Sequence, residues 1–489
     1  MRVLLVNPLS ELARQSNAYS RSVTALPPLG LAYLSAALKR NNVEVFIEDQ
    51  YATRISNDDL IKKIKHISPE VVGISCLTTA MGNAARLIKQ IKQANPQTTV
   101  ILGNIHPTLF PEETLKKEIG DIVIRGEGEE ALQETIAALS RGNGLEEIKG
   151  ISYIHKGECR HNPDRGIIDD LDSLPYPDWH SLDLRHYKRY PMLGIYNKLI
   201  LAVQGSRGCP YNCLFCSQDK FYKKPRYRDV KKIVNEIEYL YEKFRVDYIG
   251  FVDAYFPFSK TSGLEFCDEF MRRKLHKKIK WITEMRVDSV DLELMRRMKE
   301  SGLELIMYGF EVGDARILDS IGKKATLSQA RQAMEYTKKC KIRSIGLFML
   351  GLPEDTKETC SETIRFAKEL DPDICKFNIA VPFPGSIFFD QLKSQISDID
   401  NINDKFTSWY DWSSYDGGII YSPKDITKKE LLDLQRKGMF AFYMRPKVIL
   451  KHLLGRTFSL ADICYGAWLL IRNYLKVFYG KPGGIKTSE

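Results

Sequence analysis

Three cysteines lie close together in the segment Arg207-Gly208-Cys209-Pro210-Tyr211-Asn212-Cys213-Leu214-Phe215-Cys216. Their spacing is C-x3-C-x2-C, and thiolates at this spacing can each bind a different iron of one cubane iron–sulfur cluster. The fourth iron is then left without a protein ligand, and an open position of this kind binds a substrate or a cofactor in catalytic metal sites. The sequence therefore predicts a catalytic [4Fe-4S] centre with Cys209, Cys213 and Cys216 as its ligands.

Two other interpretations of these cysteines are weaker. A disulfide framework is typical of small secreted domains, whereas this chain has 489 residues and starts without the pattern of a signal peptide. A structural zinc site would need a second ligand pair nearby, but the next cysteine or histidine after Cys216 is Cys267. The other seven cysteines are scattered singly, as in a reduced protein, and we expect a cytoplasmic location.

The sequence around the cysteines alternates between apolar β-rich runs and helical patterns. Strands are predicted at residues 199–204, 248–253, 281–285, 305–310, 344–350 and 373–380, and helices between them at 230–244, 292–300, 327–340 and 356–370. Six β/α units indicate a partial (β/α)6 barrel over residues 198–425, with the active site at the carboxyl ends of the strands.

Distinctive residues follow these strands. Asp253 ends the second strand, Arg286 follows the third, Glu311 comes after the fourth and Gly351 follows the fifth. Each residue alone is typical of a loop or a helix cap. Their order behind the cysteine run resembles the radical S-adenosylmethionine (SAM) enzymes, in which the open iron chelates the amino and carboxylate groups of SAM.

This resemblance also implies the contacts of SAM with the protein. Asp253 or Glu311 would accept hydrogen bonds from its amine or ribose, and Arg286 would pair with its carboxylate. Gly351 would let the backbone approach the adenine, and Phe215 would pack against the adenine or shield the cluster.

The amino-terminal third has its own alternating pattern. Strands are predicted at residues 3–6, 43–47, 71–75, 100–102 and 122–124, and helices at 29–40, 58–66, 80–94 and 111–118. Buried strands separated by helices predict a Rossmann-like, doubly wound α/β domain over residues 1–145. Such sheets bind small molecules beyond the carboxyl ends of their strands.

Several loops of this domain resemble the cobalamin-binding domain that precedes many radical SAM domains. The matching segments are residues 27–34 (PPLGLAYL), 102–108 (LGNIHPT) and 126–129 (GEGE). The resemblance implies that Gly103 and Gly126 let the backbone approach cobalamin, and that Ser75 and Thr78 hydrogen-bond its nucleotide tail.

One feature of many cobalamin domains is missing from this sequence. They carry a D-x-H-x-x-G motif whose histidine ligates cobalt, and no such motif occurs here. His106 is a candidate ligand, although a loop histidine before a proline is more often a turn or packing residue. We therefore expect cobalamin without a histidine below the cobalt; the alternative is a degenerate domain that binds no ligand.

The remaining segments are a linker and a basic tail. Residues 146–197 are rich in Pro, Gly, Asp and His and are predicted to join the two domains. Residues 410–416 form an aromatic loop that we expect at the barrel mouth. From residue 436 onward ten Lys and Arg face only two acidic residues, so most of the net charge of +10 lies in this tail. We expect residues 426–489 to be helical, either lying on anionic lipid as a peripheral membrane contact or capping the barrel.

The whole layout resembles the cobalamin-binding radical SAM enzymes, especially the branch with hopanoid methylases and the anaerobic magnesium-protoporphyrin ester cyclase. The resemblance implies that SAM is cleaved to a 5′-deoxyadenosyl radical, that this radical takes hydrogen from an unactivated carbon, and that methylcobalamin delivers a methyl group there. The alternative is an oxidative cyclase that uses the same cofactors without methyl transfer. The implied partners are a bulky apolar or natural-product small molecule and an electron donor such as flavodoxin or ferredoxin.

A nucleic-acid-binding protein stabilised by a metal is a different class of function that a pI of 8.9 suggests. The chain outside the tail is nearly neutral, however, and a nucleic-acid binder carries its charge along an extended surface. We therefore expect no nucleic-acid partner.

Overall fold

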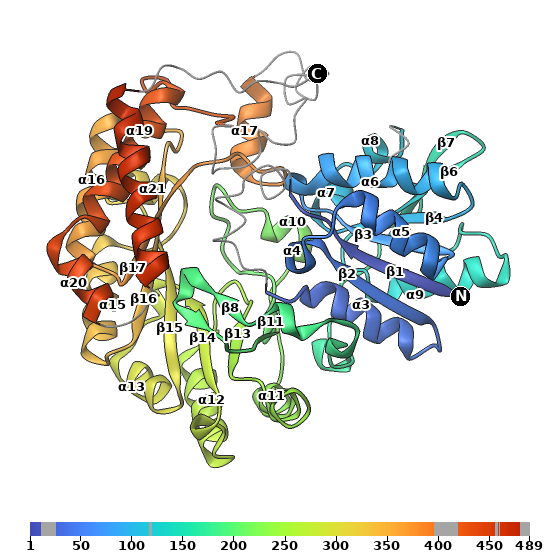
Figure 1. The fold of residues 1–489 in the computed structure, drawn as a ribbon, viewed down its shortest axis with the longest axis horizontal. Coiled ribbons are helices and arrows are strands. Elements are labelled where there is room, and N and C mark those ends of the chain that lie inside the picture. The colour runs from blue at the N-terminus through green and yellow to red at the C-terminus, as the bar shows by residue number, and fades with distance from the viewer. Residues whose placement is uncertain (11–25, 117–119, 396–418, 455–457, 459, 480–489) are drawn as a thin grey trace.

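The computed structural model describes residues 1–10, 26–116, 120–395, 419–454, 458 and 460–479. Two α/β domains lie side by side, and carboxyl-terminal helices pack against the outer side of the second (Figure 1). The expected aromatic loop at residues 410–416 lies outside the described residues. The predicted α/β class is confirmed.

The amino-terminal domain is built on a seven-stranded sheet in the order β2-β1-β3-β4-β5-β6-β7. Its parallel strands are β1 (Arg2–Asn7), β2 (Glu44–Asp49), β3 (Val71–Ser75), β4 (Thr99–Gly103) and β5 (Ile122–Ile124). The central residues of β1 are 0–1% exposed, because helices cover both faces of the sheet. The doubly wound sheet predicted from these apolar runs is therefore confirmed.

The helices divide between the two faces according to their apolar stripes. They are α3 (Leu29–Lys39), α4 (Gln50–Thr53), α5 (Asn57–Ile67), α6 (Met81–Ala94), α7 (Ile105–Leu109), α8 (Pro111–Lys116) and α9 (Glu129–Arg141). Buried residues of α3 and α9 pack with Val3 and Leu5, whereas those of α5 and α6 pack with Leu4 and Val6. Alternate residues of β1 thus face opposite cores. Sequence analysis had not predicted α9.

The segment expected to be a linker contributes to the sheet. Strands β6 (Ile151–His155) and β7 (Glu158–His161) form an antiparallel hairpin on β5. The hairpin extends the sheet past residue 145, where we had placed the end of the domain. Farther along, β8 (Arg189–Tyr190) pairs with β9 (Ile195–Tyr196).

The second domain contains a six-stranded, all-parallel sheet in the order β10-β13-β14-β15-β16-β17. The strands are β10 (Ile200–Val203), β13 (Tyr248–Phe251), β14 (Lys280–Met285), β15 (Leu303–Glu311), β16 (Arg343–Leu350) and β17 (Ile374–Ile379). The predicted partial barrel is confirmed.

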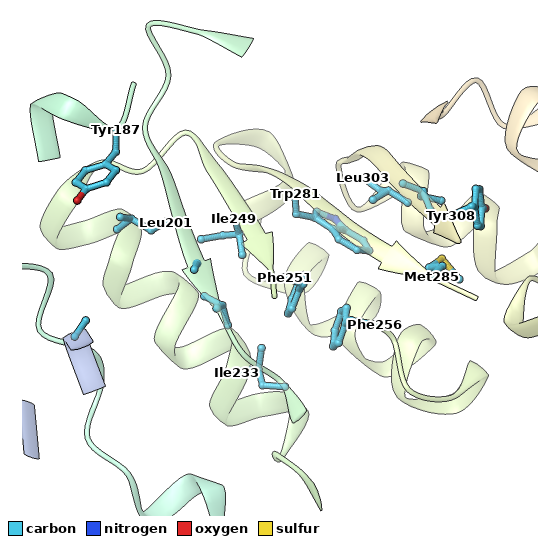
Figure 2. Packing of buried hydrophobic residues seen from close by; sticks show 14 of the residues in the cluster. Tyr187, Leu201, Ile233, Ile249, Phe251, Phe256, Trp281, Met285, Leu303 and Tyr308 are labelled. Carbon is cyan, nitrogen blue, oxygen red and sulfur yellow. The ribbon is translucent and has the colours of Figure 1, made fainter. Parts of the chain in front are cut away.

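Helices cover the outer face of this barrel. They are α11 (Val230–Phe244), α12 (Lys260–Arg272), α13 (Leu292–Glu300), α15 (Leu327–Lys339) and α16 (Lys357–Leu370). The short helix α14 (Ala315–Ser320) instead packs with Leu214 of the cysteine loop. Aromatic rings fill the space beneath α11 and α12: Phe251 and Phe256 stack with centroids 3.7 Å apart, and Trp281 lies edge-on to both (Figure 2). This core holds the strands whose ends carry the site.

The remaining elements are three short ones after the first barrel strand and four helices of the carboxyl-terminal region. They are β11 (Ser206–Arg207), α10 (Gln218–Tyr222), β12 (Arg226–Tyr227), α17 (Ile387–Gln395), α19 (Lys428–Tyr443), α20 (Pro446–Leu454) and α21 (Leu460–Tyr479). Gln435 and Tyr443 of α19 donate hydrogen bonds to the backbone of β17. The tail is helical as predicted, and α19 caps the barrel. Within the described residues, no helix is long and apolar enough to cross a membrane.

Candidate active site between the two domains

The cysteine loop is held firmly by backbone contacts. Gly208 has φ +86°, and a Cβ there would lie 2.6 Å from the carbonyl oxygen of Lys224, so only glycine fits. The Leu214 amide donates to the carbonyl of Ile321, and the Leu214 carbonyl accepts from the amide of Phe388, each at 2.9 Å. These contacts with Ile321 and Phe388 fix the course of the cysteine loop.

The three cysteines lie within electrostatic reach of one another. Cys213 is 8% exposed, and Cys209 and Cys216 are half-buried. Burial raises the pKa of the Cys213 thiol, and the positive charges of Lys323 and Arg286 oppose that rise. Burial also raises the pKa of the Cys216 thiol, with smaller contributions from the neighbouring Cys213 and Cys209.

These cysteines fit a cubane cluster. Among the described residues, no three His, Cys, Asp or Glu side chains converge on a single metal ion. In a cubane each thiolate binds a separate iron, so convergence on one point is not required. Three thiols on one loop, with two cations beside them to offset the negative charge of thiolates, suit that cluster.

Asp253 supports the cysteine loop. Its carboxylate accepts hydrogen bonds from the Gly205 amide at 3.0 Å and the Ser206 hydroxyl at 2.5 Å. Burial raises the pKa of Asp253 to about 6, although these hydrogen bonds oppose the rise. Since both oxygens already have protein donors, the structure gives Asp253 a local role; its contact with SAM stays a prediction.

Arg286 and Glu311 both contact Lys323. The Arg286 guanidinium forms two hydrogen bonds to Asp288, donates to the Lys323 carbonyl, and stacks 3.5 Å from the ring centroid of Tyr211 in the cysteine loop. Glu311 accepts from the Lys323 amine at 2.6 Å and has φ +64°, a strained conformation for a residue with a side chain. Sequence analysis had missed Lys323, because nothing in its local sequence marks it. The SAM contacts of Arg286 and Glu311 stay predictions.

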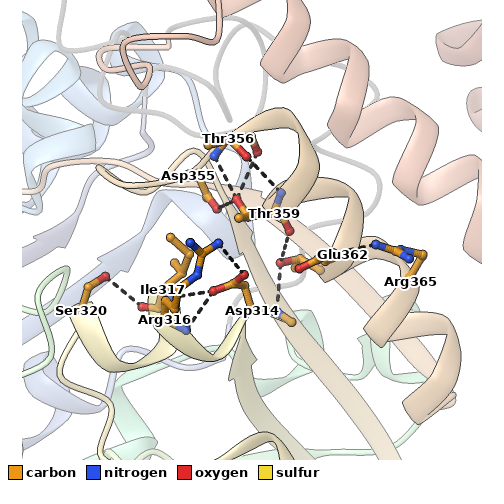
Figure 3. Close-up of polar contacts among 11 residues, drawn as sticks. Asp314, Arg316, Ile317, Ser320, Asp355, Thr356, Thr359, Glu362 and Arg365 are labelled. Carbon is orange, nitrogen blue, oxygen red and sulfur yellow. Dashed lines mark hydrogen bonds and ion pairs between the residues drawn. The ribbon is translucent and has the colours of Figure 1, made fainter.

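Gly351 and Phe215 have structural roles of their own. Gly351 has φ +83°, and a Cβ there would lie 2.6 Å from a methyl carbon of Leu431. Asp355 accepts hydrogen bonds from the amides of Gly351 and Leu352 and from the hydroxyl of Thr359; Figure 3 shows the last of these contacts. Phe215 packs against an apolar cluster beside the cysteine loop. The predicted adenine contacts of Gly351 and Phe215 remain untested.

A cavity of about 300 Å³ lies between the two domains. Predicted cobalamin residues Ser75, Gly103 and Gly126 line it at the carboxyl ends of the strands, together with Gly30. A Cβ at Gly30 or Gly126 would meet no atom within 4 Å, and one at Gly103 would meet only a single carbonyl oxygen at that distance. These glycines therefore leave backbone open to the cavity, as the binding of a large cofactor such as cobalamin requires.

The other two predicted cobalamin residues do not line this cavity. His106 is 2% exposed, and its Nδ1 lies 3.2 Å from the hydroxyl of Thr78. The ring also packs against Phe110. A role of these residues toward cobalamin stays a prediction. Asn104, which sequence analysis had not assigned, does line the cavity; it has φ +81° and donates to Ser75 at 2.9 Å.

Buried ion pairs join the cavity to the cysteine loop. Arg207 directly precedes Gly208-Cys209 and pairs with Glu127 at 2.8 Å and Glu129 at 2.5 Å. Arg226 on β12 pairs with the other oxygen of Glu127 at 2.8 Å. All four side chains are 4–7% exposed. Arg207 and both glutamates also line the cavity, so the cavity and the cysteine loop share one wall.

Comparison with known proteins agrees with this geometry. Residues 20–136 match the B12 binding domain and residues 203–367 match the Radical SAM superfamily. An uncharacterized methyltransferase of Pyrococcus horikoshii is 34% identical over 93% of this chain and 95% of its own length. The anaerobic magnesium-protoporphyrin IX monomethyl ester cyclase of Cereibacter sphaeroides is 30% identical over 91% of this chain and 71% of its own.

Solved structures share the fold. The radical SAM methyltransferase TsrM of Kitasatospora setae, with cobalamin and a [4Fe-4S] cluster bound, superposes with a TM-score of 0.65 at 18% identity, over 81% of this chain and 75% of that one. The two domains indicate three cofactors: a [4Fe-4S] cluster, SAM and cobalamin. The resemblance inferred from the cysteine run and the amino-terminal loops is confirmed, and the chain belongs to the B12-binding radical SAM enzymes.

Proposed function

We propose that this protein is a cobalamin-dependent radical SAM methyltransferase that methylates an unactivated carbon of a small molecule. The observation that carries the proposal is the shared wall: Glu127 and Glu129 line the cavity of the cobalamin domain and pair with Arg207, two residues before Cys209. When bound, the cluster supplies the electron that cleaves SAM, and cobalamin carries the methyl group that is transferred.

The residues of this chain would prepare the site for that chemistry. Cys209, Cys213 and Cys216 would hold the cluster, and Lys323 and Arg286 would offset the charge of the thiolates. Asp253 fixes the start of the loop through Gly205 and Ser206. The buried pairs of Arg207 with Glu127 and Glu129 connect the cysteine loop to the amino-terminal domain.

Methyl transfer and oxidative cyclisation are distinguished by the product mass. A relative at 30% identity is named as a cyclase, so cyclisation is the second candidate. We would incubate the anaerobically reconstituted protein with SAM bearing a trideuterated methyl group and candidate lipids and tetrapyrroles. A methylase adds about 17 mass units per turnover and forms 5′-deoxyadenosine; 5′-deoxyadenosine with a product that has only lost hydrogen would support the cyclase.

The electron donor and a membrane surface are further proposed partners. Reduction of the cluster requires a low-potential donor such as a flavodoxin or ferredoxin. Helices α20 and α21 expose several large apolar side chains, among them Leu450, Leu454 and Trp468, and Arg472 lies over the Trp468 ring. An apolar surface with neighbouring positive charge favours peripheral contact with an anionic bilayer.

A further inference from the structure

The interior of the barrel contains two charged side chains that the proposed cofactor chemistry does not use. Its deepest layer is apolar and includes Ile200, Ile282, Leu305, Ile345 and Ile374, one residue from each of five strands. This layer closes the barrel from below. Any ligand of the interior must therefore lie above it, on the side of the cysteine loop.

Side chains two positions apart on a strand point to the same face of the sheet. The residue two positions after each member of the apolar layer therefore also points into the barrel. Glu284 follows Ile282 on β14, and Lys376 follows Ile374 on β17. The corresponding residues of the strands between them, Met307 and Leu347, pack against the apolar layer. One carboxyl group and one amine thus follow the apolar layer on β14 and β17, with apolar residues on the two strands between them.

Neither charged group is satisfied by the protein. Among the residues that the structure describes, neither Glu284 nor Lys376 has a side-chain hydrogen bond or an ion pair. Burial raises the pKa of Glu284 to about 7, helped by the negative charge of Glu311. Burial lowers the pKa of Lys376, and the negative charge of Glu284 opposes this shift, although the two groups form no direct ion pair. Both side chains are partly exposed rather than fully buried. A partly desolvated charged group without a direct protein partner is favourably placed to pair with the complementary group of a ligand.

The position of the two groups relates them to the active site. Glu284 lies within electrostatic reach of Glu311 and Lys323, and Lys323 acts in turn on Cys213. A molecule held between Glu284 and Lys376 would therefore extend toward the cysteine loop. Building on the proposed function, we infer that Lys376 and Glu284 form a substrate-recognition subsite for an organic acid: Lys376 pairs with its anionic group, and Glu284 bonds to a nearby donor of the same molecule.

Two matched probes test this subsite in the full-length reconstituted protein. One is 8-anilinonaphthalene-1-sulfonate, an apolar ring system with one anionic group; the other is N-phenyl-1-naphthylamine, the same ring system without it. Equilibrium dialysis should show that Lys376→Met weakens binding of the sulfonate at least 10-fold and leaves the neutral probe unchanged. Lys376→Arg should retain most of the sulfonate affinity, because it keeps the positive charge.

The matched control is Lys299→Met. Burial also lowers the pKa of Lys299, but this residue lies on helix α13, outside the barrel, so its substitution should change neither probe. Unchanged sulfonate binding in Lys376→Met, or equal weakening of both probes, would overturn the inference. A fall in melting temperature for both Lys376→Met and Glu284→Gln, with sulfonate binding retained, would instead show a purely structural pair.

Failure of the subsite can be told apart from failure of the proposed function. Formation of 5′-deoxyadenosine from SAM is measured on the same preparations without any substrate. If the wild-type protein forms no 5′-deoxyadenosine, the proposed function is refuted, while the dialysis still tests the subsite. If 5′-deoxyadenosine forms but Lys376→Met binds the sulfonate as tightly as the wild type, only the subsite is refuted.

Discussion

The carboxyl group of Glu284 is expected to make the stability of this protein depend on pH. Burial raises its pKa in the folded state from 4.5 to about 7. Below about pH 4.5 the group is protonated in both the folded and the unfolded state. As the pH rises toward 7, only the unfolded state gains by ionising, so the folded state loses about 3 kcal/mol of stability over this window.

Glu284→Gln should remove this dependence. Urea unfolding at pH 5, 6, 7 and 8 should show that the stability advantage of the variant grows with pH and levels off above about pH 7. Glu265→Gln, an exposed substitution on α12, is the control and should keep the pH profile of the wild type. Parallel profiles for wild type and Glu284→Gln would contradict the placement of this carboxyl group.

The turn of the cysteine loop depends on Gly208. A Cβ there would lie 2.6 Å from the Lys224 carbonyl, at a φ of +86°. Gly157, in the β6–β7 turn, has a similar φ of +83° but no atom within 4 Å of an added Cβ. Gly157→Ala should therefore cost only about 1–2 kcal/mol of backbone strain. Gly208→Ala should cost more and lower the iron bound per chain after reconstitution. Equal iron content in the two variants would show that the loop does not need this turn.

Elements with a local signal could be predicted from the sequence, whereas others depend on tertiary contacts. The apolar runs at residues 3–6 and 71–75 predicted strands β1 and β3 to within a residue. The hairpin of β6 and β7 was missed because β7 is mostly exposed and polar, and it is held by pairing with its neighbour. The cysteine run predicted the cluster site, but Arg207 meets Glu127 across 80 residues of sequence, which no local pattern indicates.

The two domains should bind their cofactors interdependently through the buried ion pairs. Glu127→Gln leaves Arg207 and Arg226 with less negative charge at a buried position, and breaking a buried pair typically costs about 3–5 kcal/mol. We expect less cobalamin retained on gel filtration and less iron per chain. The control is Asp172→Asn, which weakens the buried pair with Arg228 away from the cavity and should leave cobalamin retention intact. Equal losses of cobalamin and iron in the two variants would show that the ion pairs act only through the general stability of the protein.

The carboxyl-terminal helices should bring the molecule to anionic lipid. Leu454 is 75% exposed and Trp468 51%. The protein should sediment with vesicles that contain phosphatidylglycerol but not with vesicles of pure phosphatidylcholine, and the double substitution Leu454→Ser with Trp468→Ser should weaken this binding several-fold. Ile154→Ser, an exposed apolar residue of the amino-terminal domain, is the control. Equal sedimentation of all three proteins would assign binding to another surface.

The most direct test of the central claim is SAM-dependent formation of 5′-deoxyadenosine after anaerobic reconstitution with iron, sulfide and cobalamin. The wild-type protein and Cys340→Ala, which changes a cysteine on the outside of the barrel, should both form it. Cys213→Ala should form none, since the cluster would lose one of its three ligands. Formation at the wild-type level by Cys213→Ala would contradict a cluster held by this loop.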